Sequence, residues 1–501
     1  MELRQRKSRL RKQPPEFLPP ALIACPSGGQ GDAEYTETGD FFCSEFLNKK
    51  IVFLCDLCAR LGVALRRSQA SAVKNNPKNM SVKVNPRVTD LPASAILRAA
   101  VKYSTPFFLY SEKKIRANCR LFKNAFRSFF PSFEPLYAVK ANNNPRLLKI
   151  IFSEGFGADA SSEAEAWIVK KLGARGMYTG NYTSEAEFRF VRRTGAFMLN
   201  LDDITMLATI KKIGVPQFLS FRVNPGFSRA GMKSLYLAGP DAKYGVPLEK
   251  IVEAYRRARA LGVKRFGIHA MTGSNVMEEP YFESVATALF EIAGKVKKTL
   301  GIRMERINIG GGFGVPYRPD EKSLDLVKVA RGVRRAFDRH CAKYDLPEPV
   351  LMAEPGRFIM ADTAWLVGQV NVIKDSYKKF AGIDAGMNDL PRPAIYDAYH
   401  HVTVVGKNLP ELGQGPAGRK EKINIVGRLC ENNDQFAKDR LLPLVRVGDL
   451  IAIHNAGAHA YAMGHNYNNR LRSAEYLLAE NGQIRKIRRS ESIADIFSTI
   501  V

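Results

Sequence analysis

Short apolar runs alternate with longer amphipathic stretches from about residue 115 to about residue 360. Each run ends in small or polar residues, which is typical of a buried strand, and the stretches between runs carry apolar residues at helical spacing. This alternation predicts a parallel β/α barrel rather than an open sheet. The predicted strands are Leu136–Val139, Met177–Thr179, Phe197–Leu201, Phe218–Val223, Phe266–His269, Ile307–Ile309 and Val350–Ala353. The predicted helices include Glu163–Leu172, Leu248–Leu261, Tyr281–Leu300 and Leu324–Tyr344.

The pattern changes on either side of this region. Beyond residue 365, short β-rich runs separated by turns predict a second, mostly β domain. Residues 1–90 contain two Pro-Pro pairs and little sustained periodicity. Met80 opens a stretch typical of the start of a globular domain, so we hypothesise that residues 1–79 are dispensable. The sequence thus predicts an atypical basic extension at 1–90, a segment at 91–114 that joins the β domain, a β/α barrel at 115–362 and a β domain at 363–501.

Composition and charge argue against several classes of protein. Apolar residues make up 45% of the 501 residues, which is enough for large cores, and no apolar run reaches the ~18–20 residues of a membrane span. The net charge of +27 is spread along the chain, so we expect a solvated basic surface with neither a nucleic-acid nor a membrane partner. Seven cysteines with one close pair, Cys55 and Cys58, and no zinc-spaced cluster predict a cytoplasmic protein without a metal site.

Polar and glycine residues directly follow the predicted strands. In a parallel β/α barrel the carboxyl ends of the strands meet at one rim, where ligands bind. We therefore expect a catalytic site among the residues that follow these runs, namely Lys140, Asn181, Asn224, His269, Gly310–Gly312 and Glu354–Arg357.

Three of these groups together indicate one chemistry. Lys140 follows a buried strand, where desolvation favours an amine that can attack a carbonyl group. The glycines from Gly310 onward can offer backbone N–H groups to a phosphate, although they lack the spacing of a dinucleotide or Walker motif. Glu354 adds a carboxylate at another strand end. A lysine, a phosphate cradle and a carboxylate are the groups that bind pyridoxal 5′-phosphate.

Longer motifs around these residues resemble the alanine racemase-like (fold type III) pyridoxal phosphate enzymes, and within them the diaminopimelate decarboxylases. The matching motifs occur in the family's order, and the first 90 residues lie outside them. They are YAVKAN (137–142), GADASSEAE (157–165), TGN (179–181), GSN (273–275), INIGGGFG (307–314), AEPGRFI (353–359), DAGMNDLPRPAIYDAYH (384–400), GRLCENND (427–434) and NAGAHAYAMGHNYNNRLRSAE (455–475).

The resemblance implies a role for each matching position. Lys140 would bind the cofactor covalently, and Glu354 would pair with its ring nitrogen. Cofactor binding is implied for Lys140, Ser274, Gly310, Gly311, Gly312, Glu354, Pro355, Gly356, Arg357 and His459. Substrate binding is implied for Arg357, Arg392, Tyr396, Glu431 and His459. Two guanidinium groups and a phenol suit the distal carboxylate of a dicarboxylic substrate.

The resemblance also implies a reaction and an assembly. The reaction would be the decarboxylation of meso-2,6-diaminopimelate to L-lysine and CO2, the last step of lysine biosynthesis. Lys140 and Cys430 would be the catalytic residues, with Cys430 as the proton donor. Cys430 and Glu431 would enter the site from the second subunit of a homodimer. The partners would then be an amino-acid substrate and a second copy of the chain.

Two positions depart from the family pattern. Met271 stands where the family has a histidine that stacks on the cofactor ring, and a thioether can pack there but cannot carry charge. His269, two residues earlier, could supply part of that role or be a core histidine. His459 stands where the family has a tyrosine, and we expect its imidazole to take over that contact with a charge near pH 6–7.

These departures leave two other functions open. A decarboxylase for D-lysine or D-ornithine would share the scaffold but would not need the clamp of Arg357, Arg392 and Tyr396. A non-catalytic regulator resembling the decarboxylase-like antizyme inhibitors would need no cofactor residues, whereas Lys140 and Glu354 are both present.

Overall fold

The computed structural model describes residues 85–90, 92–230, 237–406 and 419–501, which belong to one unit, 72–501. The extension before residue 85, the Cys55–Cys58 pair and the hypothetical start at Met80 lie outside the described residues. Among the described helices, none is long and apolar enough to cross a membrane. The predicted domain boundaries stay predictions.

Eight parallel strands in the order β5-β4-β3-β2-β12-β11-β9-β6 close into a barrel, because β5 and β6 also pair with each other, and the short strand β8 adds to β6 outside this ring. This confirms the predicted fold class. The strands are β2 (Glu134–Ala138), β3 (Gly157–Ala160), β4 (Gly176–Tyr178), β5 (Phe197–Leu201), β6 (Phe218–Asn224), β9 (Arg265–His269), β11 (Met304–Asn308) and β12 (Val350–Ala353). Sequence analysis missed β3, whose GADA sequence has no large apolar residue.

Close approach of the backbones explains the glycines in this part of the barrel. A Cβ atom at Gly176 would lie 1.8 Å from the carbonyl oxygen of Ala158 on the neighbouring strand. Neither backbone could move far inside a closed sheet, so only glycine fits there.

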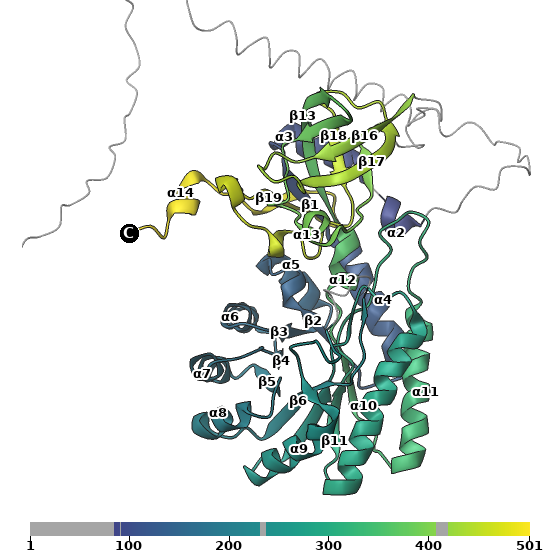
Figure 1. The fold of residues 1–501 in the computed structure, drawn as a ribbon, viewed down its shortest axis with the longest axis vertical. Helices are drawn as coiled ribbons and strands as arrows, with labels where there is room; N and C mark the ends of the chain where they lie inside the picture. The colour runs from purple at the N-terminus through teal and green to yellow at the C-terminus, as the bar shows by residue number, and fades with distance from the viewer. Residues whose placement is uncertain (1–84, 91, 231–236, 407–418) are drawn as a thin grey trace, which may run out of the picture. The chain divides into compact units, whose positions relative to one another are not determined.

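Amphipathic helices surround the barrel (Figure 1). Side chains cap several of them: Ser162 Oγ accepts from the Glu165 N–H, and Ser184 Oγ accepts from the Glu187 N–H. The two longest helices pack through Phe290 and Phe337, whose ring centroids lie 5.4 Å apart. The helices are α4 (Glu112–Arg127), α5 (Pro145–Ser153), α6 (Glu163–Lys171), α7 (Glu185–Thr194), α8 (Met206–Ile213), α9 (Ile251–Ala260), α10 (Glu279–Leu300) and α11 (Leu326–Tyr344).

A second sheet forms the β domain. Its strand β1 (Phe107–Ser111) precedes the barrel in sequence, yet it pairs antiparallel with β13 (Ala364–Asp375) and parallel with β19 (Ala474–Leu478). The other strands are β14 (Lys379–Ile383), β15 (Val402–Val404), β16 (Lys420–Val426), β17 (Gln435–Pro443), β18 (Leu450–Ile453) and β20 (Ile484–Arg488). The segments predicted as β-rich, Trp365–Ile373, His400–Val405, Lys422–Val426 and Leu450–His454, overlap β13, β15, β16 and β18.

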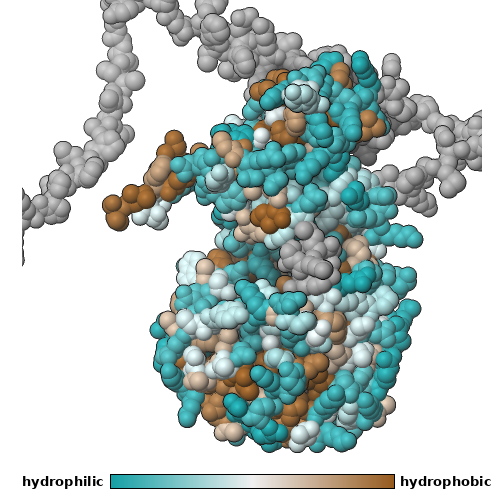
Figure 2. Space-filling view, viewed as in Figure 1, coloured by the Kyte–Doolittle hydropathy of each residue, from teal (hydrophilic) through white to brown (hydrophobic). Residues whose placement is uncertain are grey.

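Short elements complete the described structure. They are α2 (Pro86–Thr89), α3 (Ala93–Lys102), α12 (Arg357–Met360), α13 (Arg392–Tyr396), α14 (Ile493–Phe497), β7 (Arg229–Ala230), β8 (Val246–Pro247) and β10 (Gly273–Ser274). Hydrophilic residues cover much of the face shown in Figure 2, while Ile493 and Phe497 on α14 are exposed.

A buried carboxylate joins the β domain to the barrel. Glu475 on β19 accepts hydrogen bonds from Tyr110 Oη at 2.7 Å and from Asn144 Nδ2 at 2.8 Å, and it also pairs with Arg488. Asn142 Nδ2 donates to Tyr110 Oη at 3.0 Å and to the Gly457 carbonyl at 3.1 Å. Because Asn142 and Asn144 follow β2 directly, the network fixes the loop that carries Lys140.

We expect Glu475→Ala to destabilise the protein by about 3–5 kcal/mol, because it leaves Tyr110, Asn144 and Arg488 without their buried acceptor. Urea unfolding measures the change. Glu480→Ala is the matched control, since its carboxylate is half-exposed and 3.5 Å from Arg116. The control should stay within about 0.5 kcal/mol of wild type. Equal stability of the two variants would contradict the role given to Glu475.

Candidate active site

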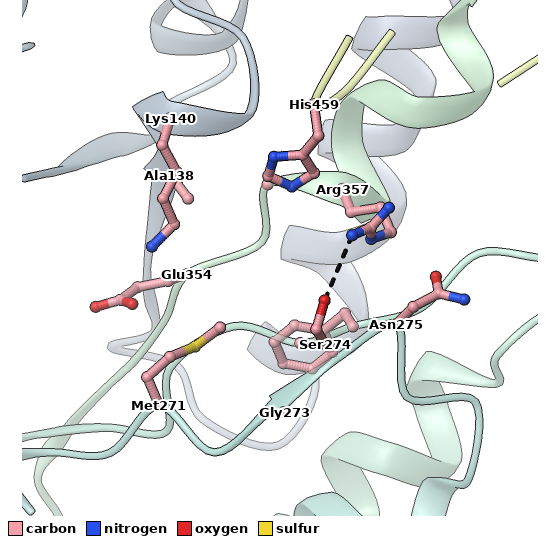
Figure 3. Close-up of a pocket in the computed structure, with 12 residues that line it drawn as sticks. Ala138, Lys140, Met271, Gly273, Ser274, Asn275, Glu354, Arg357 and His459 are labelled. Atoms are coloured by element: carbon pink, nitrogen blue, oxygen red, sulfur yellow. Dashed lines mark hydrogen bonds between the residues drawn. The ribbon is translucent and has the colours of Figure 1, made fainter. Parts of the chain in front are cut away.

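One pocket lies at the carboxyl ends of the barrel strands (Figure 3). Barrel residues form most of its wall, and His459 reaches it from the segment between β18 and β19. The lining residues are Ala138, Lys140, Met271, Gly273, Ser274, Asn275, Gly312, Phe313, Glu354, Gly356, Arg357 and His459. The structure thus brings together Lys140, Ser274, Gly312, Glu354, Gly356, Arg357 and His459 from the predicted set.

Lys140 lies in a single 3-10 turn, Val139–Ala141, directly after β2. Its side chain is about half-exposed, and Nζ lies 3.9 Å from Asp159 Oδ2 on β3. Burial raises the pKa of Asp159 well above its usual value, the charge of Glu354 raises it further, and Lys140 opposes both. The pocket therefore offers an accessible amine beside a buried carboxyl group that tends to hold its proton. Asp159 belongs to the quoted GADASSEAE motif, but sequence analysis gave it no role.

Glu354 follows β12 and is buried. Its Oε1 accepts a hydrogen bond from Asn308 Nδ2 at 2.7 Å and lies 3.3 Å from His269 Nε2. Burial alone would raise the pKa of Glu354, but His269, Lys140 and Asn308 together bring it below the usual value. Glu354 is thus held as a carboxylate at the wall of the pocket, where it can accept a hydrogen bond from the N–H group of a protonated ring nitrogen.

The glycine loop after β11 packs directly against the loop after β9. Gly310 and Gly312 have φ values of +71° and +89°. A Cβ atom at Gly310 would lie 2.1 Å from the Ala270 carbonyl oxygen, and one at Gly312 would lie 2.8 Å from that of Gly273. Side chains are therefore excluded here, and backbone forms this wall of the pocket.

The opposite end of the pocket from Glu354 offers hydrogen-bond donors, as Figure 3 shows. Arg357 Nη2 donates to Ser274 Oγ at 3.4 Å, and Arg357 Nη1 donates to Tyr317 Oη at 2.8 Å. Within the described part of the chain, the N–H groups of Gly312 and Phe313 have no hydrogen-bond partner. A hydroxyl, a guanidinium and unpaired backbone N–H groups suit a phosphate. With Lys140 and Glu354 at the other end, the pocket fits pyridoxal phosphate.

A second guanidinium lies next to this end of the pocket. Arg392 begins α13 and is buried, with its guanidinium 4.5 Å from the ring centroid of Tyr317 and Nη1 2.7 Å from His400 Nε2. Burial, with a contribution from Arg357, lowers the pKa of Arg392 to about 10. Across residues 85–90, 92–230, 237–406 and 419–501, no carboxylate lies within 4.0 Å of either guanidinium. Arg357 and Arg392 therefore form a cationic pair that lacks an anion. Sequence analysis missed Tyr317, which both arginines contact.

His459 does not titrate as expected. Its backbone is left-handed, with φ +54°, and its N–H donates to the Ala141 carbonyl at 2.9 Å. Burial, followed by the charges of Arg357, Arg392 and Lys140, lowers the pKa of the imidazole well below its usual value. The expected charge near pH 6–7 is therefore wrong, because three cations from separate segments converge on this side chain.

Met271 lines the pocket, whereas His269 does not. Met271 Sδ accepts the Gly311 N–H at 3.1 Å, so this thioether also holds the glycine loop. His269 is almost fully buried and contacts Glu354 instead of facing the open space. His269 thus does not reach the pocket, and Met271 alone of the two lines it.

Several predicted residues lie outside the pocket lining. Gly310, Gly311 and Pro355 are neighbours of lining residues, and Tyr396 is half-buried on α13. Cys430 and Glu431 are exposed. The Cys430 N–H donates to Asn468 Oδ1 at 2.7 Å, which fixes the backbone of this segment. Within one chain, then, Cys430 and Glu431 are not part of the pocket.

Known proteins resemble this chain over most of its length. Residues 112–361 match the pyridoxal-binding domain of the pyridoxal-dependent decarboxylases. A diaminopimelate decarboxylase of Methanothermobacter thermautotrophicus is 38% identical over 403 residues, covering 79% of this chain and 92% of that protein. Protein TabA of Pseudomonas amygdali pv. tabaci is 38% identical over 396 residues, covering 78% of this chain and 90% of that protein. Diaminopimelate decarboxylase from Helicobacter pylori, crystallised with L-lysine, superposes with a TM-score of 0.72 at 29% identity, covering 80% and 98% of the two chains.

We expect His459 to contribute nothing to the pH dependence of pyridoxal phosphate binding, because its imidazole stays neutral. His459→Gln, which is neutral at every pH, should follow the wild-type profile between about pH 6 and about pH 8. Titration of cofactor fluorescence with both proteins measures this. An affinity that rises at the acidic end in the wild type alone would reveal a cationic imidazole and contradict the expectation.

Proposed function

The chain belongs to the pyridoxal-dependent decarboxylase family, and from this premise we propose that it converts meso-2,6-diaminopimelate to L-lysine and CO2. It is a carboxy-lyase that uses pyridoxal 5′-phosphate. The observation that carries the choice of substrate is the pair of partly buried Arg357 and buried Arg392, which has no carboxylate partner among the described residues. The similarity to diaminopimelate decarboxylases supports the same choice.

The residues that would hold the cofactor lie at opposite ends of the pocket. Lys140 would bind its aldehyde covalently, and Glu354 would pair with its ring nitrogen. Ser274, Arg357 and the loop of Gly310, Gly311 and Gly312 would hold its phosphate, next to Pro355, Gly356 and His459. When bound, the cofactor supplies an electron sink for the electron pair left behind by CO2.

The arginine pair would orient the substrate. Diaminopimelate carries a carboxylate at each end, and binding one end to Arg357 and Arg392 leaves the other end to react near Lys140. A charge-assisted hydrogen bond from a guanidinium to a carboxylate is strong, and Tyr317 contacts both guanidinium groups and keeps them in place. Tyr396, on the same short helix as Arg392, would add a phenol to this clamp. D-lysine and D-ornithine lack a distal carboxylate, so they would leave the pair unneutralised.

A second copy of the chain would complete the site. Cys430 and Glu431 are exposed and lie outside the pocket of their own chain, which supports the proposal that they act in the site of a homodimeric partner. There the Cys430 thiol would donate the proton that replaces CO2, and Glu431 would bind the distal ammonium group. We also propose that the enzyme works in the cytoplasm.

We expect CO2 release with lysine formation from meso-diaminopimelate, and little reaction with D-lysine or D-ornithine, when the purified chain is loaded with pyridoxal phosphate. Lys140→Ala is the control and should be inactive with all three, since it lacks the amine that binds the cofactor. Preference for D-lysine or D-ornithine would overturn the proposed substrate. A wild-type chain that binds no cofactor would favour a non-catalytic role.

We expect Arg392→Met to lower kcat/KM for diaminopimelate by about 10–150-fold, because a hydrogen bond to a charged group contributes about 1.5–3 kcal/mol. Any slow turnover of D-lysine should change far less, since that substrate offers no distal carboxylate. Arg318→Met is the matched control, because the Arg318 guanidinium stacks 4.0 Å from the ring centroid of Tyr399 and not on Tyr317. An equal loss with both substrates would mean that Arg392 has a general structural role.

A further inference from the structure

We propose that His269 is a positioning residue for Glu354, and that it holds this carboxylate in the orientation that recognises a protonated ring nitrogen. The inference rests on the proposed function, because it concerns how the cofactor pocket selects its ligand. It gives a task to a buried polar group that the reaction itself does not use.

Side chains from β9 and β11 contact the Glu354 carboxylate, and a third from β5 lies behind the imidazole. His269 ends β9 and its Nε2 lies 3.3 Å from Glu354 Oε1, while Asn308 at the end of β11 donates to the same oxygen at 2.7 Å. On the far side of the imidazole, Asn200 Nδ2 of β5 lies 3.0 Å from His269 Nδ1. His269, Asn200 and Asn308 are all at most 1% exposed. His269 and Asn308 therefore both contact Oε1, while no hydrogen bond to Oε2 is made within the described residues.

The proton on His269 must face Glu354. If Asn200 Nδ2 donates to Nδ1, the neutral ring carries its hydrogen on Nε2. If the amide is turned round, Nδ1 donates to its oxygen, and a bare Nε2 would then face a carboxylate at 3.3 Å, which is repulsive unless Nε2 is also protonated. In both cases an N–H group points toward Glu354. Nε2 makes no hydrogen bond within the described residues, so the contact with Glu354 Oε1 at 3.3 Å is an electrostatic one that an N–H group on Nε2 makes favourable.

Met271 makes this arrangement more important. The thioether beside the ring position can pack against a ring but offers no donor to a ring atom, and it accepts the Gly311 N–H. Polar recognition of the ring nitrogen therefore falls to Glu354. If the Glu354 carboxylate were disordered, no other carboxylate in the pocket lining could take its place.

A buried histidine that only fills the core would show a different response, and two ligands separate the cases. Pyridoxal 5′-phosphate and its 1-deaza analogue, in which a C–H group replaces the ring nitrogen, share the aldehyde and the phosphate. The full chain, freed of cofactor, is titrated with each ligand and the two dissociation constants are compared. This ratio reports on the ring nitrogen alone and requires no turnover.

Two variants replace the imidazole of His269 with an amide on a shorter or a longer side chain. In His269→Asn the amide can replace Nδ1 but falls short of Glu354, whereas in His269→Gln it can reach the position of Nε2. Glu354→Gln removes the carboxylate itself. His340→Asn is the control, because His340 is also buried but lies on α11, where Nδ1 bonds to the Ala336 carbonyl. His269→Leu replaces His269→Asn if the latter does not fold.

We expect wild type, His340→Asn and His269→Gln to prefer pyridoxal phosphate over the analogue by about 10–150-fold, as for a hydrogen bond to a charged group. The preference should be lost in Glu354→Gln and reduced at least about tenfold in His269→Asn. Equal weakening of both ligands in His269→Asn, with the ratio unchanged, would overturn the inference while leaving the proposed function intact. A wild-type chain that binds neither ligand would overturn the proposed function itself.

Discussion

The pocket depends on the buried carboxylate of Glu475. A charge out of contact with water is stable only when donors surround it, and here the donors come from β1, from the loop after β2 and from β20. The requirement to satisfy one anion thus fixes the barrel loop against the β sheet. That contact holds Lys140 opposite His459, whose own N–H bonds to the Ala141 carbonyl.

Charge is distributed unevenly within this frame. Glu354 is surrounded by donors and stays ionised. Asp159 lies on β3, separated from β12 by β2 alone, and tends to keep its proton. At the other end of the pocket Arg357 and Arg392 have no carboxylate among the described residues. The two guanidinium groups are held by one tyrosine and repel each other, which destabilises the protein without ligand. An anionic ligand offsets this repulsion. The affinity of this end for a carboxylate follows from that repulsion as much as from the hydrogen bonds.

The barrel and the location of its site were predictable because both follow from local pattern. Apolar runs of strand length followed by Lys140, the glycine loop and Glu354 already place those groups at one rim. Strand β3 escaped notice because its small residues carry no hydrophobic signal. Tyr317 was missed for another reason: it lies in an irregular segment, and its partners Arg357 and Arg392 come from distant parts of the chain.

Protonation was the least predictable property. The type of residue at position 459 suggested a titrating imidazole, yet its pKa depends on Arg357, Arg392 and Lys140, which only the fold brings together. His269 shows the same limit. Because His269 lies two residues before Met271, its side chain was expected on the same side as that of Met271. In the structure it is buried against Glu354 instead.

The place of β1 in the sheet has a consequence for how the protein is made. Phe107 pairs with Val367 on one side and with Ala474 on the other, so the strand leaves the ribosome long before either partner. Throughout synthesis of the barrel its apolar residues have no sheet to join, and closing such distant contacts is slow. During that interval the apolar residues of β1 lack their native partners, which is the condition that favours non-native association. The β domain can complete its fold only once the last of its central strands has emerged.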